Sequence, residues 1–137
     1  MKRLMNWAIV PAALALLAIT APIAASNPVQ TPLRSPVTVQ GTSGGSQPNN
    51  SCRGFMFSGT PSQVVRVTES IASLRFRVEG QGQMALLITG PGNPICIPAS
   101  GNAIDVPGVW QQGSYSVFVG DRPNASSSFT LSITQEN

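Results

Sequence analysis

The chain has few charged residues and almost none that could act as a general base. Only 9% of its 137 residues are charged, it contains no histidine, and its one lysine is Lys2. A nucleophilic serine needs a histidine or lysine beside it to become reactive. Beyond the first residues neither a Ser-His-Asp triad nor a Ser-Lys pair can be assembled, so those classes of hydrolase are excluded.

Carboxylates are also scarce, and they are scattered along the chain. The acidic residues are Glu69, Glu79, Asp105, Asp121 and Glu136. Glycoside hydrolysis needs two carboxylates held on either side of one bond, and no motif here brings two together. Glycine-rich stretches fall between expected strands and not before a helix, so they do not predict a phosphate cradle. We expect no catalytic activity and no cofactor, and a carboxylate-dependent hydrolase is the remaining enzymatic alternative.

The first 25 residues have the order of regions of a secretory signal peptide. Lys2 and Arg3 form a positive start, and residues 7–25 are apolar with one exception. Small residues precede Ser26, which predicts cleavage after Ala25. An uncleaved membrane anchor is the alternative, although two prolines within the apolar run disfavour a rigid span. The chain is therefore expected to be secreted or periplasmic, with membrane contact only through an uncleaved signal.

Removing this segment changes the net charge. The whole chain carries a formal charge of +3, and loss of Lys2 and Arg3 leaves six arginines against five acids, or +1. Nucleic-acid binding needs a clustered excess of positive charge. We expect no nucleic-acid partner.

Two cysteines, Cys52 and Cys96, remain in a chain bound for an oxidising compartment. An even count there favours one intramolecular disulfide. Two free thiols or a metal pair are the alternatives, but a tetrahedral metal site would need histidine or further cysteine. A bridge between them is expected to be structural.

The composition changes near Ser51. Residues 26–51 are rich in Pro, Ser, Thr, Gln, Gly and Asn, with few large apolar side chains. Such a composition favours a disordered linker. It would act either as a spacer or as a tail without a task.

Residues 52–137 alternate apolar and polar side chains in short runs that are broken by Gly, Pro and Asn. This pattern is typical of β-strands. Residues 84–89 form an apolar run that ends at Thr89, which fits a strand buried on both faces. About seven short strands without crossover helices predict an all-β fold, a small antiparallel β-sandwich. A partly closed barrel is the alternative.

Four segments of this region resemble the bacterial pre-peptidase C-terminal domain. They are SLRFRV (residues 73–78), LLITGPG (86–92), GSYSVFVG (113–120) and FTLSI (129–133), and the resemblance spans about residues 55–134. It implies a jelly-roll-like β-sandwich of secreted bacterial proteins, an accessory module without chemistry of its own. Some of these domains bind calcium through acidic loops, but residues 97–102 contain no carboxylate. Asp105 and Asp121 are expected as isolated loop carboxylates that cap turns, with a shared metal site as the alternative.

Two candidate binding surfaces follow from the strand pattern. If the strands around Val67 and Leu74 pair as a hairpin, Arg66 and Arg75 oppose each other and Arg77 lies nearby. This patch would suit anionic glycans or lipid headgroups, because guanidinium groups pair with carboxylate and phosphate. The alternative is a solvated face that protects the sheet from edge pairing.

Trp110 and Tyr115 are the second candidate. They would form an aromatic platform for sugars, or alternatively Trp110 would close the core as a lid. The sequence therefore predicts an exported, non-catalytic accessory or binding module that contacts a glycan or an envelope protein. A structural envelope protein that assembles through sheet edges is the alternative from another class.

Overall fold

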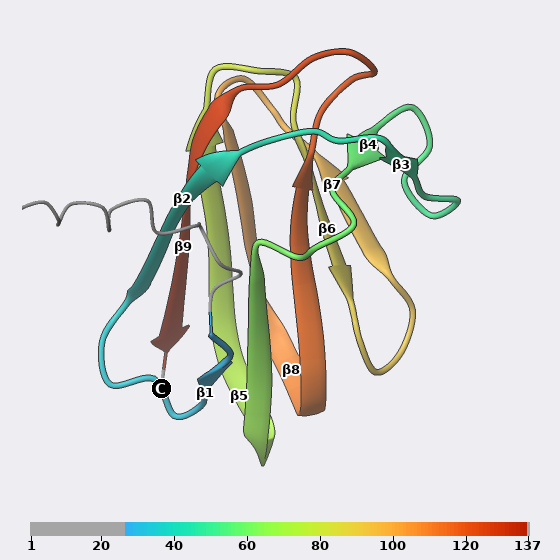
Figure 1. Ribbon diagram of the computed structural model, residues 1–137. Helices are drawn as coiled ribbons and strands as arrows, with labels where there is room; N and C mark the ends of the chain where they lie inside the picture. Colours follow the sequence, from blue (N-terminus) through green and yellow to red (C-terminus); the bar gives the residue numbers. More distant parts are fainter. Residues whose placement is uncertain (1–26, 137) are drawn as a thin grey trace, which may run out of the picture.

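β-Strands provide the regular secondary structure of residues 27–136, the part of the chain that the computed structural model describes (Figure 1). The strands are β1 (Val29–Gln30), β2 (Val37–Thr42), β3 (Gln47–Pro48), β4 (Met56–Phe57), β5 (Gln63–Gly80), β6 (Ala85–Thr89), β7 (Ile95–Pro98), β8 (Ala103–Gly120) and β9 (Ser128–Glu136). The expected signal peptide lies outside the described residues. Within them, no helix is long and apolar enough to cross a membrane.

One large sheet has the strand order β2-β9-β5-β8-β6-β7, and β1 joins it by pairing with β5. Every pair in it is antiparallel except β1 with β5. The short strands β3 and β4 form a separate antiparallel pair. The predicted all-β, antiparallel fold is confirmed.

The two longest strands divide this sheet into two layers. The pairing of β5 with β8 shifts register between Val67 and Ile71. Residues 71–80 of β5 and 103–111 of β8 continue into β9 and β2, whereas residues 63–67 of β5 and 113–120 of β8 continue into β1, β6 and β7. The ribbon shows β5 and β8 each bending sharply near the lower end of the molecule, so that the two halves of each strand run in different layers (Figure 1). Each therefore belongs to both layers of the sandwich.

The buried side chains confirm the predicted alternation. In β9 the buried residues are Phe129, Leu131 and Ile133, and their neighbours Thr130 and Ser132 are only partly buried. In β5 the buried positions are odd-numbered up to Val67 and even-numbered from Ala72 onward. This change falls at the register shift, where β5 advances four residues, from Val67 to Ile71, while β8 advances two, from Gly113 to Gln111. The irregular backbone there changes which side chains face the core in both strands. Both layers thus contribute to one hydrophobic core.

Strand β6 is buried on both faces, as its continuous apolar sequence predicted. Leu86 and Ile88 belong to the main core, while Ala85 and Leu87 belong to a second cluster that includes Phe55 and other residues of the 52–57 segment. That segment covers the outer face of β6.

A disulfide holds the covering segment in place. Cys52 and Cys96 are bonded, with their Cα atoms 5.4 Å apart, and Cys96 lies in β7 next to β6. The predicted pairing is confirmed. Because a small domain buries limited apolar surface, a cross-link over 44 residues is a large contribution to its stability.

The structure differs from the sequence-based expectation over residues 27–51. β2 pairs with β9 over six residues, from Val37 opposite Ile133 to Thr42 opposite Ser128. An edge strand buries little of its surface, so two valines are enough to pack β2 against the sandwich. The segment is rich in Ser, Thr and Gln, which give no sign of a strand. This segment is therefore part of the sandwich.

Candidate functional site

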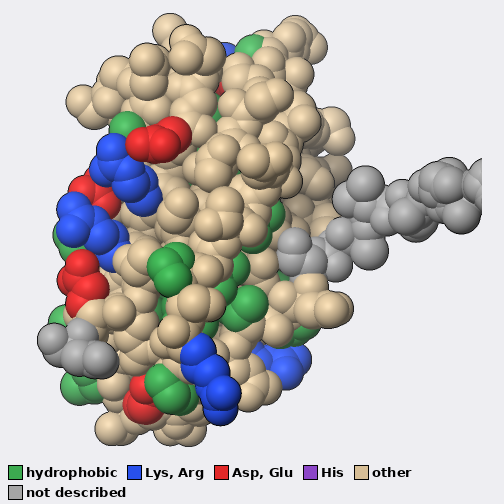
Figure 2. Space-filling view, turned by 90° about the vertical axis from the view of Figure 1, so that its left-hand side faces the viewer, with side chains coloured by type: hydrophobic (Ala, Val, Ile, Leu, Met, Phe, Trp, Pro, Cys, Tyr) green, Lys and Arg blue, Asp and Glu red, His purple; other side chains and the backbone are tan. Residues whose placement is uncertain are grey.

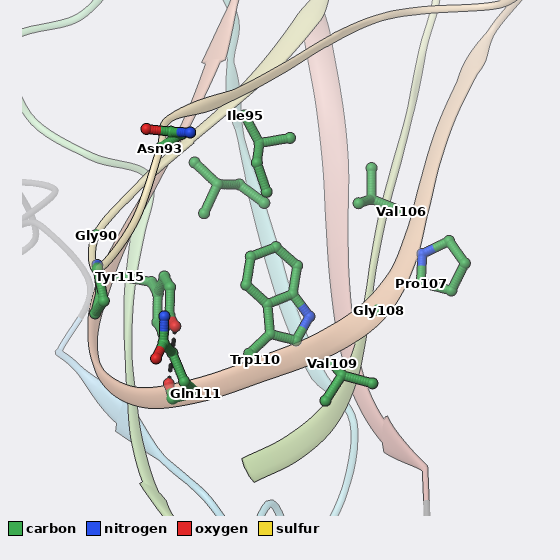
Figure 3. A pocket seen from close by; sticks show the side chains of 12 residues that line it. Gly90, Asn93, Ile95, Val106, Pro107, Gly108, Val109, Trp110, Gln111 and Tyr115 are labelled. Atoms are coloured by element: carbon green, nitrogen blue, oxygen red, sulfur yellow. Dashed lines mark hydrogen bonds between the residues drawn. The ribbon is translucent and has the colours of Figure 1, made fainter. Parts of the chain in front are cut away.

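A groove opens along one flank of the sandwich, between the edge of β8 and the hairpin of β6 and β7. Its volume is about 250 Å³. We call it the flank groove. The residues that shape it include Ile88, Asn93, Ile95, Val106, Gly108, Trp110 and Gln111, and no charged side chain lines it. Figure 3 shows the indole of Trp110 pointing into the space below Ile95.

Trp110 and Tyr115 form the floor of this groove. Their exposed fractions are only 6% and 4%, and their rings pack edge to face with centroids 5.4 Å apart. The Trp110 indole NH donates to the carbonyl of Leu74 at 3.3 Å, and the Tyr115 hydroxyl donates to the carbonyl of Gln111 at 2.8 Å. Burial raises the pKa of the Tyr115 hydroxyl. The sequence linked these two residues, and the structure places them together as a buried floor, which corresponds to the core-lid alternative.

The loop between β6 and β7 lies close against this floor. A Cβ atom on Gly90 would lie 2.6 Å from the Tyr115 ring, and one on Gly113 would lie 2.3 Å from the Pro91 ring. Gly113 also has a positive φ of 148°. Both glycines therefore let the loop approach β8 closely enough to form one wall of the groove.

Arg75 and Arg77 lie on the outer face of β5 in a network of ion pairs. The Arg75 guanidinium contacts both carboxylate oxygens of Asp105, at 2.8 and 2.5 Å, and lies 3.7 Å from Glu136. Arg77 pairs with Glu79 at 3.1 Å. Arg75 lowers the pKa of the Asp105 carboxyl, mainly through their hydrogen bond, and the pKa of Arg75 is raised.

Figure 2 shows positive and negative side chains interleaved on one side of the molecule. Two arginines here face three carboxylates, so this part of the surface carries no excess of positive charge. Asp105, which was expected in a turn, lies within β8 opposite Arg77.

Arg66 is not part of this network, and the predicted hairpin was wrong. β5 continues through the region as one strand, in which Arg66 opposes Ser114 whereas Arg75 opposes Pro107. Residues 68–73 contain no Gly, Pro or Asn, the residues that a tight hairpin turn requires. The change in alternation between Val67 and Ala72 suggested two separate strands. It arises from an irregularity within the single strand β5.

The remaining two carboxylates, Asp121 and Glu69, are held by hydrogen bonds. Asp121 is 1% exposed and accepts from the Ser43 hydroxyl and the Arg122 backbone NH, both at 2.8 Å. Glu69 accepts from the Thr31 hydroxyl and from the Gln135 amide, and these bonds lower its pKa. Across residues 27–136, no three His, Cys, Asp or Glu side chains are grouped as metal ligands.

Comparison with solved structures identifies the fold. The chain is similar to the pre-peptidase C-terminal domain of collagenase from Bacillus anthracis, with a TM-score of 0.55 and 17% sequence identity over 79% of this chain and 93% of that one. The predicted resemblance to this domain is confirmed at the level of the fold. A periplasmic inhibitor of g-type lysozyme from Salmonella Typhimurium is also similar, at a TM-score of 0.40 and 12% identity over 81% of this chain and 100% of that one, too distant to bear on function.

In sequence, the chain is 33% identical over 79 residues to an uncharacterized protein of Synechococcus elongatus. The match covers 54% of this chain and 59% of that protein's length. No known protein-family profile matches the chain. These comparisons establish the fold and indicate no ligand.

Proposed function

We propose that this protein is exported and acts as a non-catalytic binding module that holds an uncharged glycan segment in the flank groove. The observation that carries the proposal is the groove itself, an uncharged depression with a rigid aromatic floor. Grooves with apolar walls and a few polar groups at the rim are typical of ligand sites. The disulfide supports export, because such bonds persist in oxidising compartments.

The carboxylates support binding rather than hydrolysis. Asp105, Glu79 and Glu136 pair with arginines on the outer face, and Asp121 and Glu69 accept hydrogen bonds from neighbouring side chains. A carboxylate that acts as acid or base must reach a substrate bond. Each of these five is instead engaged with another part of the fold.

The chemistry of the groove favours an uncharged glycan over an anionic one. Asn93 and Gln111 are exposed at its rim, and their amides can donate to and accept from sugar hydroxyls. The walls formed by Ile95, Val106 and Pro91 can pack against the apolar faces of sugar rings. No guanidinium lies among the lining residues to recruit a carboxylate.

The flank that borders the groove favours a binding module over self-assembly through that flank. Pro98 ends β7, and Pro107 lies in the part of β8 that borders the groove. Proline cannot donate to a strand from another molecule and disfavours pairing at an edge. Addition of a second copy along this flank is therefore opposed by the residues that form it.

A matched pair of glycine substitutions tests the proposal. A Cβ atom on Gly108 would lie 3.5 Å from the Trp110 indole, in ordinary contact, so Gly108→Leu fills the groove without a backbone clash. Gly59 has no atom within 4 Å of its Cβ position and lies away from the groove, so Gly59→Leu makes the same change elsewhere.

Calorimetry against neutral and acidic envelope polysaccharides measures the effect. We expect the wild type and Gly59→Leu to bind a neutral polysaccharide equally, and Gly108→Leu to lose at least about tenfold in affinity, the result of displacing a well-fitted apolar contact. Equal binding by all three proteins, or binding of none of the neutral polymers by the wild type, would contradict the proposal.

A further inference from the structure

A second depression, which we call the Arg122 pocket, lies where the loop after β8 meets the disulfide-bonded segment. Its volume is about 320 Å³, and Phe55, Gln83, Met84, Pro98 and Arg122 are among its lining residues. The guanidinium of Arg122 lies over the Phe55 ring, 4.4 Å from its centroid. None of the lining residues is acidic.

Arg122 differs from Arg75 and Arg77 in its partners. Its Nε donates to the side-chain oxygen of Gln83 at 3.3 Å and its Nη1 to the backbone carbonyl of Gly54 at 3.4 Å, both neutral acceptors. Among the ion pairs formed within residues 27–136, none involves Arg122. Its positive charge is therefore not matched by a carboxylate facing it across the pocket.

The adjacent acid, Asp121, does not fill that role. It is 1% exposed, and both of its carboxylate oxygens accept hydrogen bonds, one from the Ser43 hydroxyl and one from the backbone of Arg122. Gly82 covers it, since a Cβ atom there would lie 2.6 Å from an Asp121 oxygen. Asp121 therefore holds the backbone of Arg122 and does not pair with its guanidinium, which lines the pocket.

The walls of the pocket are held in position before any ligand binds. Phe55 follows Cys52 by three residues, and its backbone NH donates to the Cys52 carbonyl at 3.4 Å. Pro98, which also lines the pocket, follows Cys96 by two residues, so the disulfide ties together two of the segments that line it. A site whose groups are already ordered loses less conformational entropy on binding.

We propose that the Arg122 pocket binds the carboxylate of an acidic sugar residue, such as a uronate, in an envelope or extracellular polysaccharide. A guanidinium matches a carboxylate in shape and charge, and Gln83 offers an amide to a neighbouring hydroxyl. The lining residues Pro98 and Ala99, which are exposed and partly exposed, provide an apolar surface for the sugar ring. The inference rests on the proposed binding function and adds a second site with a ligand of different charge.

A charge-neutralising pair of variants tests it on the whole exported protein with its disulfide intact. Arg122→Gln removes the guanidinium from the pocket, and Arg66→Gln removes one from an exposed position on β5. The probes are an oligogalacturonate, a neutral galactan oligomer of equal length, and inorganic phosphate. Thermal unfolding of both variants checks that each remains folded.

We expect saturable binding of the oligogalacturonate that Arg122→Gln weakens by about tenfold or more, as expected for loss of a hydrogen-bonded charge, and that Arg66→Gln leaves unchanged. Phosphate that displaces the oligomer at equal concentration would show a site for any small anion and overturn the assignment to a uronate. Equal effects of the two substitutions, or no binding, would also overturn it. Gly108→Leu is expected to spare this binding, so failure of the flank groove and failure of the Arg122 pocket are distinguishable.

Discussion

Single polar residues fasten the N-terminal part of the described chain to the sandwich. The Thr31 hydroxyl donates to Glu69 and accepts from the backbone NH of Thr68 at 3.0 Å. The Gln135 amide donates to Glu69 at 3.1 Å, and its oxygen accepts from the backbone of Leu33 at 2.7 Å. These bonds join β5, β9 and the segment between β1 and β2, because each side chain is shared by two of these elements.

Glu69 makes this connection dependent on pH. Hydrogen bonds from Thr31 and then Gln135 lower its pKa from the ordinary value of 4.5. A carboxyl whose folded-state pKa is lowered contributes stability above its unfolded pKa, and that contribution is lost as the pH falls through the folded pKa. We expect the wild type to melt at a higher temperature than Glu69→Gln at about pH 7, and the gap to narrow as the pH falls below the ordinary value of 4.5 and through the lowered folded-state pKa.

Thermal unfolding of the two proteins across this range measures the effect. Asp105 is present in both, so its own lowered pKa does not enter the difference between them. A gap that is constant with pH would show that the carboxylate of Glu69 does not make the contribution described.

At the scale of elements, the bend shared by β5 and β8 determines where the flank groove forms. Beyond the register shift, β8 changes which side chains face inward, from Trp110 on one side to Tyr115 on the other. Gly113 lies between them with a φ of 148°, directly beneath Pro91. The close approach of the loop and the strand depends on the absence of a side chain at that position.

Replacing Gly113 should therefore disturb both the fold and the groove. We expect Gly113→Ala to lower the free energy of unfolding by about 2–4 kcal/mol, from backbone strain together with the contact against Pro91. Gly59→Ala, at a position with no neighbour within 4 Å, should change it by less than about 0.5 kcal/mol. Urea denaturation of both variants makes the comparison, and equal stabilities would refute this role for Gly113.

How much of this architecture could be predicted depends on how each element is buried. Leu131 and Ile133 alternate with hydroxyl residues in β9, which turns one face to the core. The two-residue period of the apolar side chains and the strand propensity of these residues both predict a β-strand. The sequence did not predict β2, because Val37 and Val39 are its only branched apolar residues. Its pairing partner, β9, lies at the far end of the chain, so no local pattern indicates the pairing.

The candidate sites show the same division. The pairing of Cys52 with Cys96 followed from counting, because only one intramolecular bridge exists for two cysteines. The surroundings of Arg66, Arg75 and Arg122 could not be predicted in this way. They depend on the register shift in β5 and on contacts between residues as distant in sequence as Gly54 and Arg122. Such contacts have no signature in local sequence.

At the scale of the molecule, the disulfide connects the two hydrophobic clusters by holding the 52–57 segment against β6 and β7. The bridge closes a loop of 44 residues, which on the chain-entropy model contributes about 4 kcal/mol. We expect the double substitution Cys52→Ala and Cys96→Ala to lower the free energy of unfolding by about that amount while the main core stays assembled. Guanidinium denaturation measures the loss, and a change below about 1 kcal/mol would contradict the account.

The central claim is that the flank groove is the ligand site of a non-catalytic module. Its most direct test is to titrate the isotope-labelled protein with the neutral oligosaccharide selected by the binding panel and to follow the indole NH signal of Trp110 with the backbone amides around it. The account predicts saturable shifts confined to residues 106–111 of β8, to Tyr115 and to the loop between β6 and β7. Shifts confined instead to the outer face around Arg75, or none at saturating ligand, would contradict it.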